Sequence, residues 1–318
     1  MSYPTRWGLA SGAAGPTTIF LLESSMHTDR TLVLHGQLFH FTEWGDPAAP
    51  VVVMLHGITG HARTWDDEAR ALSSGDFTAH LAGGTGSARD ATRYRVLALD
   101  QRGHGDSDPA PDGDHTTGTL ADDLAAFCGA LGLGRVSCVG LSMGGRVAMA
   151  YAGRQPARVE RLVVVDIGPE VAPAGRARVG AQMGGAPERF EAVADALAYQ
   201  RANNPRYAEA LLRHRVEHGL RALPGGGFTW KYDRALRDAV RNGRWRDTTD
   251  LWPLWQAIAC PTLIVRGADS DILSPEIAKR MLETNPRARL VEVPAAGHTV
   301  PGDQPTAFQA LVAEFLGA

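Results

Sequence analysis

Short, wholly apolar runs alternate along the chain with longer segments whose apolar positions repeat every three to four residues. Such runs are typical of strands buried on both faces of a sheet, and the periodic segments are typical of amphipathic helices. Two period-two segments that meet at Gly36 predict a hairpin. We expect strands at 31–35, 37–42, 51–55, 94–99, 136–139, 162–165, 262–265 and 290–293, and helices at 65–72, 120–131, 143–154, 275–282 and 304–316. This alternation predicts an α/β fold, a mostly parallel sheet with helices on both faces.

The alternation is interrupted over residues 167–259. This stretch carries helix patterns near 189–201, 207–218 and 232–240, and it shows no clear strand. We therefore expect a helical cap at 167–259, inserted into a core formed by 26–166 and 260–318. Residues 73–92, rich in Gly, Ser, Thr and Ala, predict a surface insertion. Residues 1–25 are expected to be a poorly ordered N-terminal extension, with Met26 as a candidate natural start.

Composition narrows the class of protein. The 318 residues include 32 basic and 35 acidic side chains, a net charge of −3. This balance argues against a nucleic-acid partner, which requires a strongly basic surface. The sequence has no run of 18 apolar residues, so it predicts no transmembrane helix. The three cysteines lack metal-ligand spacing, and two of them lie in apolar segments that favour core positions in a reducing, cytoplasmic compartment. The composition does not indicate the oligomeric state.

The motif Gly140-Leu141-Ser142-Met143-Gly144 lies where a predicted strand passes into a predicted helix. In this context a G-x-S-x-G motif forms a sharp turn that exposes the serine hydroxyl. The glycines permit the tight turn and keep side chains away from it. An exposed hydroxyl beside a base is a nucleophile, so Ser142 is the candidate.

Further polar groups follow other predicted strands. They are the segments 56–59, 100–108, 266–271 and 297–299, and Asp166. The carboxyl ends of parallel strands meet at one edge of an open α/β sheet, where ligands bind. We therefore expect Ser142, an acid and the late histidine His298 to meet at this edge of the sheet. Their order along the chain is Ser, Asp, His.

Together these segments resemble the α/β-hydrolase superfamily over residues 26–317. The resemblance is carried by the HGxx turn at 56–59, the D-x-R-G-x-G-x-S run at 100–107, the elbow at 140–144, the acid loop at 267–271 and Gly297-His298. It implies an eight-stranded, mostly parallel sheet flanked by helices, with the cap over the active site. The Ser-Met-Gly-Gly elbow is similar to a branch that holds small-molecule esterases, lactonases, carbon–carbon bond hydrolases and cofactor-free haloperoxidases.

The resemblance also implies roles. Ser142 attacks a carbonyl carbon, and His298 takes and later returns the proton. The backbone N–H groups of Ile58 and Met143 form the oxyanion hole. Neither a metal nor an organic cofactor is implied.

The triad acid has three candidates. The common family position, three residues after Gly267, holds Ser270. We favour Asp271, because the apolar pair after it resembles the segment that anchors this loop. Asp269 ranks second, and Asp166 third, because some family members place the acid after that earlier strand.

The cap is basic. From 169 to 259 it holds 13 Arg and 1 Lys against 10 Asp and Glu, a net charge of +4. The basic residues either face water in exposed helices or attract carboxylate-bearing substrates. His214 and His218, four apart, fit a solvated helix face better than a metal site, because no third ligand stands near them in the sequence. Some of the four late tryptophans are expected to pack the cap, and one or two to line a pocket: Trp230, Trp245, Trp252 and Trp255.

These observations predict a serine hydrolase of a small ester or lactone that forms an acyl-enzyme on Ser142. One alternative keeps the triad and cleaves a carbon–carbon bond in a diketone-type acid. A third interpretation, from another class, is a ligand-binding receptor that kept the fold and lost turnover.

Overall fold

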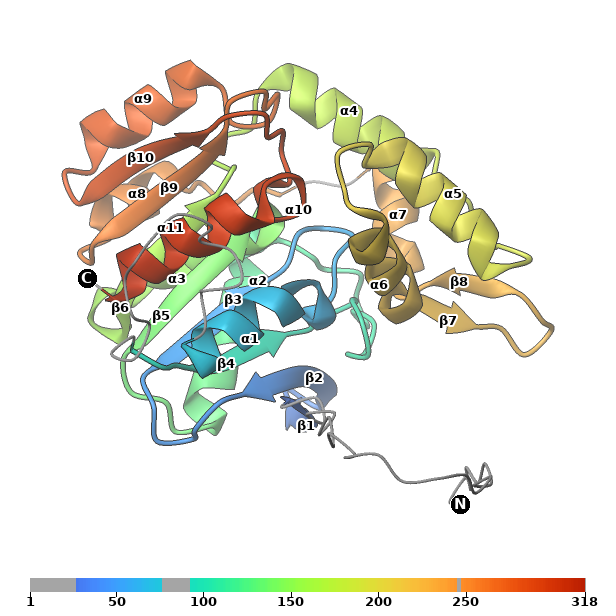
Figure 1. Cartoon of the computed structure of the whole chain (residues 1–318), viewed down its shortest axis with the longest axis horizontal. Helices are drawn as coiled ribbons and strands as arrows, with labels where there is room; N and C mark the ends of the chain where they lie inside the picture. The colour runs from blue at the N-terminus through green and yellow to red at the C-terminus, as the bar shows by residue number, and fades with distance from the viewer. Residues whose placement is uncertain (1–26, 76–91, 245–246, 318) are drawn as a thin grey trace, which may run out of the picture.

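The computed structural model describes residues 27–75, 92–244 and 247–317 (Figure 1). The expected extension at 1–25, Met26, Trp245 and most of the expected insertion at 73–92 lie outside the described residues. Eight strands form one sheet in the order β1-β2-β4-β3-β5-β6-β9-β10. They are β1 (His27–Leu34), β2 (Gln37–Trp44), β3 (Val51–Leu55), β4 (Arg95–Leu99), β5 (Val136–Leu141), β6 (Val159–Val165), β9 (Thr262–Gly267) and β10 (Ala288–Val293).

The predicted hairpin and parallel sheet are both confirmed. Strands β1 and β2 pair antiparallel, with Leu34 opposite Gln37, and β2 pairs antiparallel with β4. From β4 to β10 every neighbouring pair is parallel. The inner strands β3 and β5 and the apolar second half of β6 are almost wholly buried, as expected for strands covered on both faces.

Helices cover both faces of the sheet (Figure 1). On one face, apolar side chains of α2 (Thr117–Ala130), α3 (Met143–Arg154), α8 (Trp252–Ala257) and α9 (Pro275–Thr284) join one buried cluster. On the other face, α1 (Asp66–Ser74), α10 (Val300–Asp303) and α11 (Pro305–Gly317) pack on a second cluster. This two-faced core fixes the carboxyl ends of the central strands, which is where the candidate site lies.

The cap is a separate group of elements between β6 and α8 (Figure 1). A third apolar cluster, around Phe190 and Trp230, holds part of it together. Its elements are α4 (Pro173–Gly184), α5 (Val193–Asn203), α6 (Glu209–Gly219), β7 (Leu220–Ala222), β8 (Phe228–Trp230) and α7 (Arg234–Arg241). The elements α5, α6 and α7 were predicted. The expectation of a strand-free cap was wrong, because β7 and β8 form a hairpin whose three-residue strands are too short to show alternation.

Helix α8 also corrects the picture of the cap. It falls inside the expected cap range of 167–259, yet it packs on α3 of the core. Trp255 is fully buried there, and its indole N–H donates to the carbonyl oxygen of Met281 at 3.0 Å. The short apolar stretch therefore belongs with the core.

Two compositional predictions can be compared with the described residues. Cys128, Cys138 and Cys260 are all buried and free, whereas the sequence favoured core positions for only two of them. None of the helices in the described part of the chain is long and apolar enough to cross a membrane.

Candidate active site

Ser142 stands on a strained turn between β5 and α3. Its φ of 55° and ψ of −116° lie in a region that non-glycine residues rarely adopt. A Cβ at Gly140 would collide with the backbone of Gly144, and one at Gly144 would collide with the carbonyl of Leu55. The two glycines therefore allow the turn that presents the serine hydroxyl, as the motif predicted.

Three side chains from separate strand ends form a hydrogen-bonded chain. The Ser142 hydroxyl lies 2.9 Å from Nε2 of His298, and Nδ1 of His298 lies 2.8 Å from Oδ2 of Asp166. An Nδ1–H that donates to Asp166 leaves Nε2 as the acceptor for the serine proton. Asp166 is fully buried, and Ser142 and His298 both line one cavity. The arrangement has the connectivity of a nucleophile, base and orienting acid.

The acid that meets His298 is the third-ranked candidate, and the preference for Asp271 needs correction. Asp271 follows β9, and both its carboxylate oxygens accept from Arg178 of the cap, at 2.6 and 2.8 Å. Asp269 pairs with another cap arginine, Arg206, at 2.9 Å. These carboxylates are partly exposed at the cap side of the cavity, whereas Asp166 lies directly behind the imidazole.

Local geometry explains why Asp166 occupies this position. It is the first residue after β6, it has a positive φ of 49°, and its N–H donates to the carbonyl of Val265 at 2.8 Å. Its carboxylate accepts from the N–H of Gly267 at 3.0 Å and from the hydroxyl of Ser270. The serine at the common acid position thus supports an acid supplied by the neighbouring strand. A serine at the common acid position was the sequence signal that the acid comes from β6. The prediction gave more weight to the apolar pair after Asp271.

The two expected oxyanion donors lie near Ser142: Met143 follows it in the chain, and Ile58 lines the same cavity. Met143 begins α3, where the first N–H groups have no partner inside the helix. Ile58 follows β3, in a loop held from behind. Nε2 of His104 lies 2.8 Å from the carbonyl oxygen of Ile58, and the Gln101 side chain donates to the carbonyl of His56 at 2.8 Å. These two contacts hold the loop through carbonyl oxygens and do not use the Ile58 N–H.

His56 and His104 act as braces, as their sequence context predicted. The backbone N–H of Gln101 donates to Nε2 of His56 at 3.1 Å, and the other His56 ring nitrogen bonds the Gly57 carbonyl. Burial lowers the pKa of His56 to about 3, so the ring stays neutral in its structural role.

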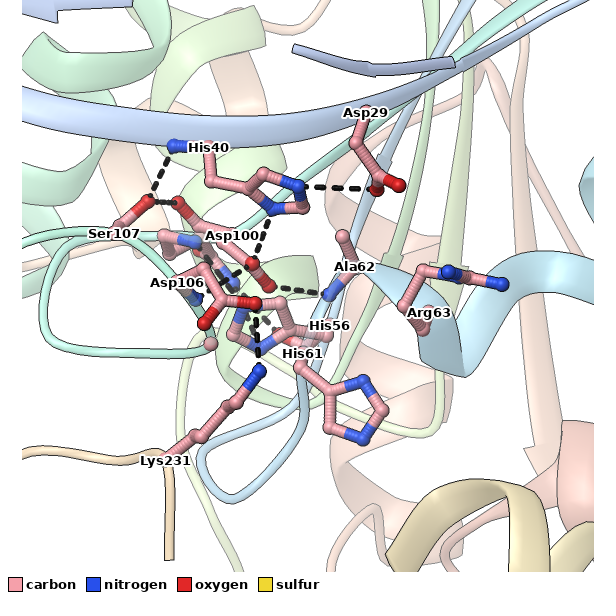
Figure 2. Close-up of polar contacts among 12 residues, drawn as sticks. Asp29, His40, His56, His61, Ala62, Arg63, Asp100, Asp106, Ser107 and Lys231 are labelled. Carbon is pink, nitrogen blue, oxygen red and sulfur yellow. Dashed lines mark hydrogen bonds and ion pairs between the residues drawn. The ribbon is translucent and has the colours of Figure 1, made fainter. Parts of the chain in front are cut away.

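Asp100 is the centre of a second buried network, behind the same loop (Figure 2). Its carboxylate accepts from Nδ1 of His40 at 2.7 Å and from the backbone N–H groups of Ala62 at 2.5 Å and Asp106 at 3.0 Å. Burial alone would raise the pKa of Asp100, but the hydrogen bond from His40 and the neighbouring donors lower it to about 2. This carboxylate joins strand β2 to the segments that follow β3 and β4.

We predict that Asp100→Asn destabilises the protein by about 3 kcal/mol at pH 7, because it leaves buried donors and His40 without their charged partner. The folded-state pKa lies below the ordinary value of 3.8, so ionised Asp100 adds stability above about pH 4. That contribution is lost as pH falls toward about 2. Urea unfolding at pH 7 and pH 2.5 should show the difference between wild type and variant shrinking in acid, and an equal difference at both values would contradict the assignment.

The cavity in front of Ser142 and His298 has a volume of about 370 Å³ and lies between the strand ends and the cap. Most of the residues that line it have polar side chains, and they include three cap arginines. Arg178 and Arg206 are paired with Asp271 and Asp269. Arg215 donates only to Thr59, at 3.3 Å to the hydroxyl and 3.5 Å to the carbonyl, and pairs with no carboxylate within the described residues. Its buried Nε also has no partner there.

The described tryptophans of the late cluster do not line this cavity. Trp230 packs within the cap, Trp255 lies in the core, and Trp252 stacks under the guanidinium of Arg280 at 3.7 Å. None of these three tryptophans therefore lines the cavity beside Ser142, although Trp230 lines a separate cavity of the cap.

Comparison with known proteins gives the family. Residues 50–305 match the alpha/beta hydrolase fold family, so the chain belongs to that family. It is 32% identical over 277 residues to a 3-hydroxybutyrate-oligomer hydrolase of Cupriavidus necator, which covers 83% of this chain and 87% of the relative. It is 30% identical to an esterase of Mycobacterium tuberculosis, over 85% of this chain and 83% of that protein.

Solved structures agree on the fold. The crystal structure of E-2-(acetamidomethylene)succinate hydrolase aligns with a TM-score of 0.79 and 25% identity, and covers 92% of this chain and all of the other. The family match and the curated relatives together make the chain a hydrolase of the α/β type.

Proposed function

We propose that this hydrolase cleaves small-molecule esters or lactones through an acyl-enzyme on Ser142. The observation that carries the proposal is the chain of contacts from the Ser142 hydroxyl to His298 and on to Asp166. The cavity beside these groups, of about 370 Å³, has room for a small substrate but not for a polymer segment of many residues.

The proposed mechanism follows from the atoms in contact. Nε2 of His298 takes the proton as Ser142 Oγ attacks the carbonyl carbon, and Asp166 stabilises the imidazolium that forms. The N–H groups of Ile58 and Met143 receive the developing oxyanion, and loss of one such donor typically costs about 3–4 kcal/mol. The imidazolium then protonates the leaving alcohol. Water activated by His298 attacks the acyl-enzyme, and the acid product leaves from a regenerated serine.

Labelling and kinetics test this course. A fluorophosphonate should add one covalent group to Ser142, and a p-nitrophenyl ester should give a burst of phenolate followed by slower turnover. Folded protein that neither labels nor turns over any short ester would contradict the proposal.

We further propose that the preferred substrates carry a carboxylate, which Arg215 binds. Arg215 is the cavity arginine without an acidic partner among the described residues, and a guanidinium binds a carboxylate through two parallel hydrogen bonds. Relatives named as hydrolases of 2-(acetamidomethylene)succinate and of 3-hydroxybutyrate oligomers are consistent with acid-bearing substrates.

Arg215→Gln should therefore lower kcat/KM for a carboxylate-bearing ester by about 10- to 100-fold, chiefly through KM, because a charge-assisted hydrogen bond contributes about 1.5–3 kcal/mol. A neutral ester of similar size should be little affected. Arg221→Gln is the matched control, because it removes one cap charge outside this cavity. Equal losses for both esters, or for both variants, would count against a direct contact.

The carbon–carbon hydrolase alternative uses the same triad and the same arginine. A screen of dienoate-type diketone acids beside esters of matched charge separates the two. We expect faster turnover of the esters, and a clear preference for the diketone acids would replace the ester proposal.

A further inference from the structure

A group of metal-ligating side chains lies where the cap meets the core, apart from the triad. Asp66 begins α1 of the core, and His214 and His218 lie one turn apart on α6 of the cap. One potential ligand atom from each residue lies within 4.8 Å of the others. The third ligand that the sequence did not reveal is thus supplied by Asp66, about 150 residues earlier in the chain.

The existing contacts leave donor atoms available for a metal. Asp66 is almost fully buried; its Oδ2 contacts Nη2 of Arg63 at 2.7 Å and Nε2 of His214 at 3.1 Å. Its Oδ1 is buried and has no hydrogen-bond partner among the described residues. A buried carboxylate oxygen without a donor is rare, and a cation is one of the groups that satisfies it.

His218 is the second available ligand. It contacts the ring of His214, with centroids 4.5 Å apart, and it makes no hydrogen bond to a described residue. Two imidazoles four residues apart on a helix share one face, which is a common way to bind Zn²⁺.

We propose that Asp66, His214 and His218 bind a zinc-type divalent cation that links the cap to the core. Two imidazole nitrogens and one carboxylate oxygen leave the fourth tetrahedral position to water. Coordination through Nε2 of His214 replaces the proton that this nitrogen now shares with Asp66 and with the carbonyl of Arg63, so that proton is released. A second cavity, of about 330 Å³ and lined in part by His214, gives a route of entry.

A second cluster shows what distinguishes this site. His40, Asp100 and Asp106 are also close enough to share a cation. There, however, Asp100 already accepts from His40 and two backbone N–H groups, and Asp106 pairs with Lys231 at 2.7 Å (Figure 2). Internal donors satisfy that cluster, whereas Asp66 Oδ1 and His218 have none among the described residues.

The position of the site gives it a consequence for the cap. Helix α6 also carries Arg215, which lines the active cavity. A metal held by α1 and α6 together would fix α6, and with it Arg215, against the core. We expect zinc to raise the melting temperature of the wild-type protein, because a ligand that binds only the folded state stabilises it.

The test titrates the untagged full chain with Zn²⁺ by calorimetry in a buffer that does not bind zinc. The wild type should bind one equivalent of zinc, and His218→Ala should weaken binding by at least about tenfold. Loss of a residue that only hydrogen-bonds to a metal ligand already lowers affinity by about 10- to 100-fold, and loss of the ligand itself should cost no less. This variant leaves the contacts between Asp66 and His214 in place, so it should fold. Arg63→Gln should strengthen binding, because it removes a cation that competes for Asp66.

Two controls make the result decisive. His35→Asn removes an exposed turn histidine and should leave zinc affinity unchanged. His298→Ala reports any zinc bound at the catalytic histidine. The proposal is overturned if the wild type binds no zinc, if His218→Ala binds it as tightly, or if only His298→Ala loses it. None of these outcomes depends on the proposed ester hydrolysis, because binding and not turnover is measured.

Discussion

Ser142→Ala is expected to reduce kcat for ester hydrolysis by about 10⁶-fold, the typical loss when the nucleophile of such a triad is removed. The substitution deletes one oxygen that His298 alone contacts among the described side chains, at 2.9 Å. The oxyanion donors and the cavity remain, so substrate affinity should persist. Covalent labelling by a fluorophosphonate, followed by intact mass, should disappear completely.

Ser274→Ala is the matched control. Ser274 is the N-cap of α9, where its hydroxyl accepts from the N–H of Ile277 at 3.3 Å. Its loss should cost about 1 kcal/mol of stability and leave kcat unchanged. The ligand-binding receptor interpretation makes the opposite prediction for Ser142: wild type and Ser142→Ala would bind a ligand equally, and neither would form product.

Most of the fold could be predicted because its signals are local. The buried strands β3, β5 and β6 are apolar runs, and α3 begins at Met143, immediately after a glycine-flanked serine. Ser142 and His298 could also be predicted, because each follows a strand that periodicity reveals. The β7–β8 hairpin could not, because three-residue strands carry too little pattern.

The contacts between distant segments explain what the sequence could not give. Three carboxylates follow strand ends near the expected site, and sequence spacing cannot say which one faces His298. That choice depends on the backbone of Asp166, whose positive φ turns its carboxylate toward the imidazole, and on Arg178, which lies in the cap and holds Asp271. In the same way, the Asp66 contact to His214 depends on how the cap docks on the core.

Asp166→Asn is expected to lower kcat by about 10⁴-fold with little change in KM, as in triads where an amide replaces the acid. An amide cannot stabilise the imidazolium, and its NH₂ group can favour the wrong tautomer of His298. The carboxylate now accepts from three groups, the His298 ring, the Gly267 N–H and the Ser270 hydroxyl. Circular dichroism and unfolding should show that the variant remains folded, so that the loss is assigned to chemistry.

Asp271→Asn and Asp269→Asn provide the comparison, because they remove the two acids that the sequence favoured. Each breaks a partly exposed ion pair with a cap arginine, and such pairs contribute at most about 1 kcal/mol. We expect each variant to keep kcat within about fivefold of the wild type. The lost ion pair weakens contacts with the cap, and the contacts of His298 are unchanged. A collapse of kcat in Asp271→Asn together with near-normal turnover in Asp166→Asn would mean that the acid loop rearranges in the working enzyme, and the proposed triad would then have to be rebuilt around the loop after β9.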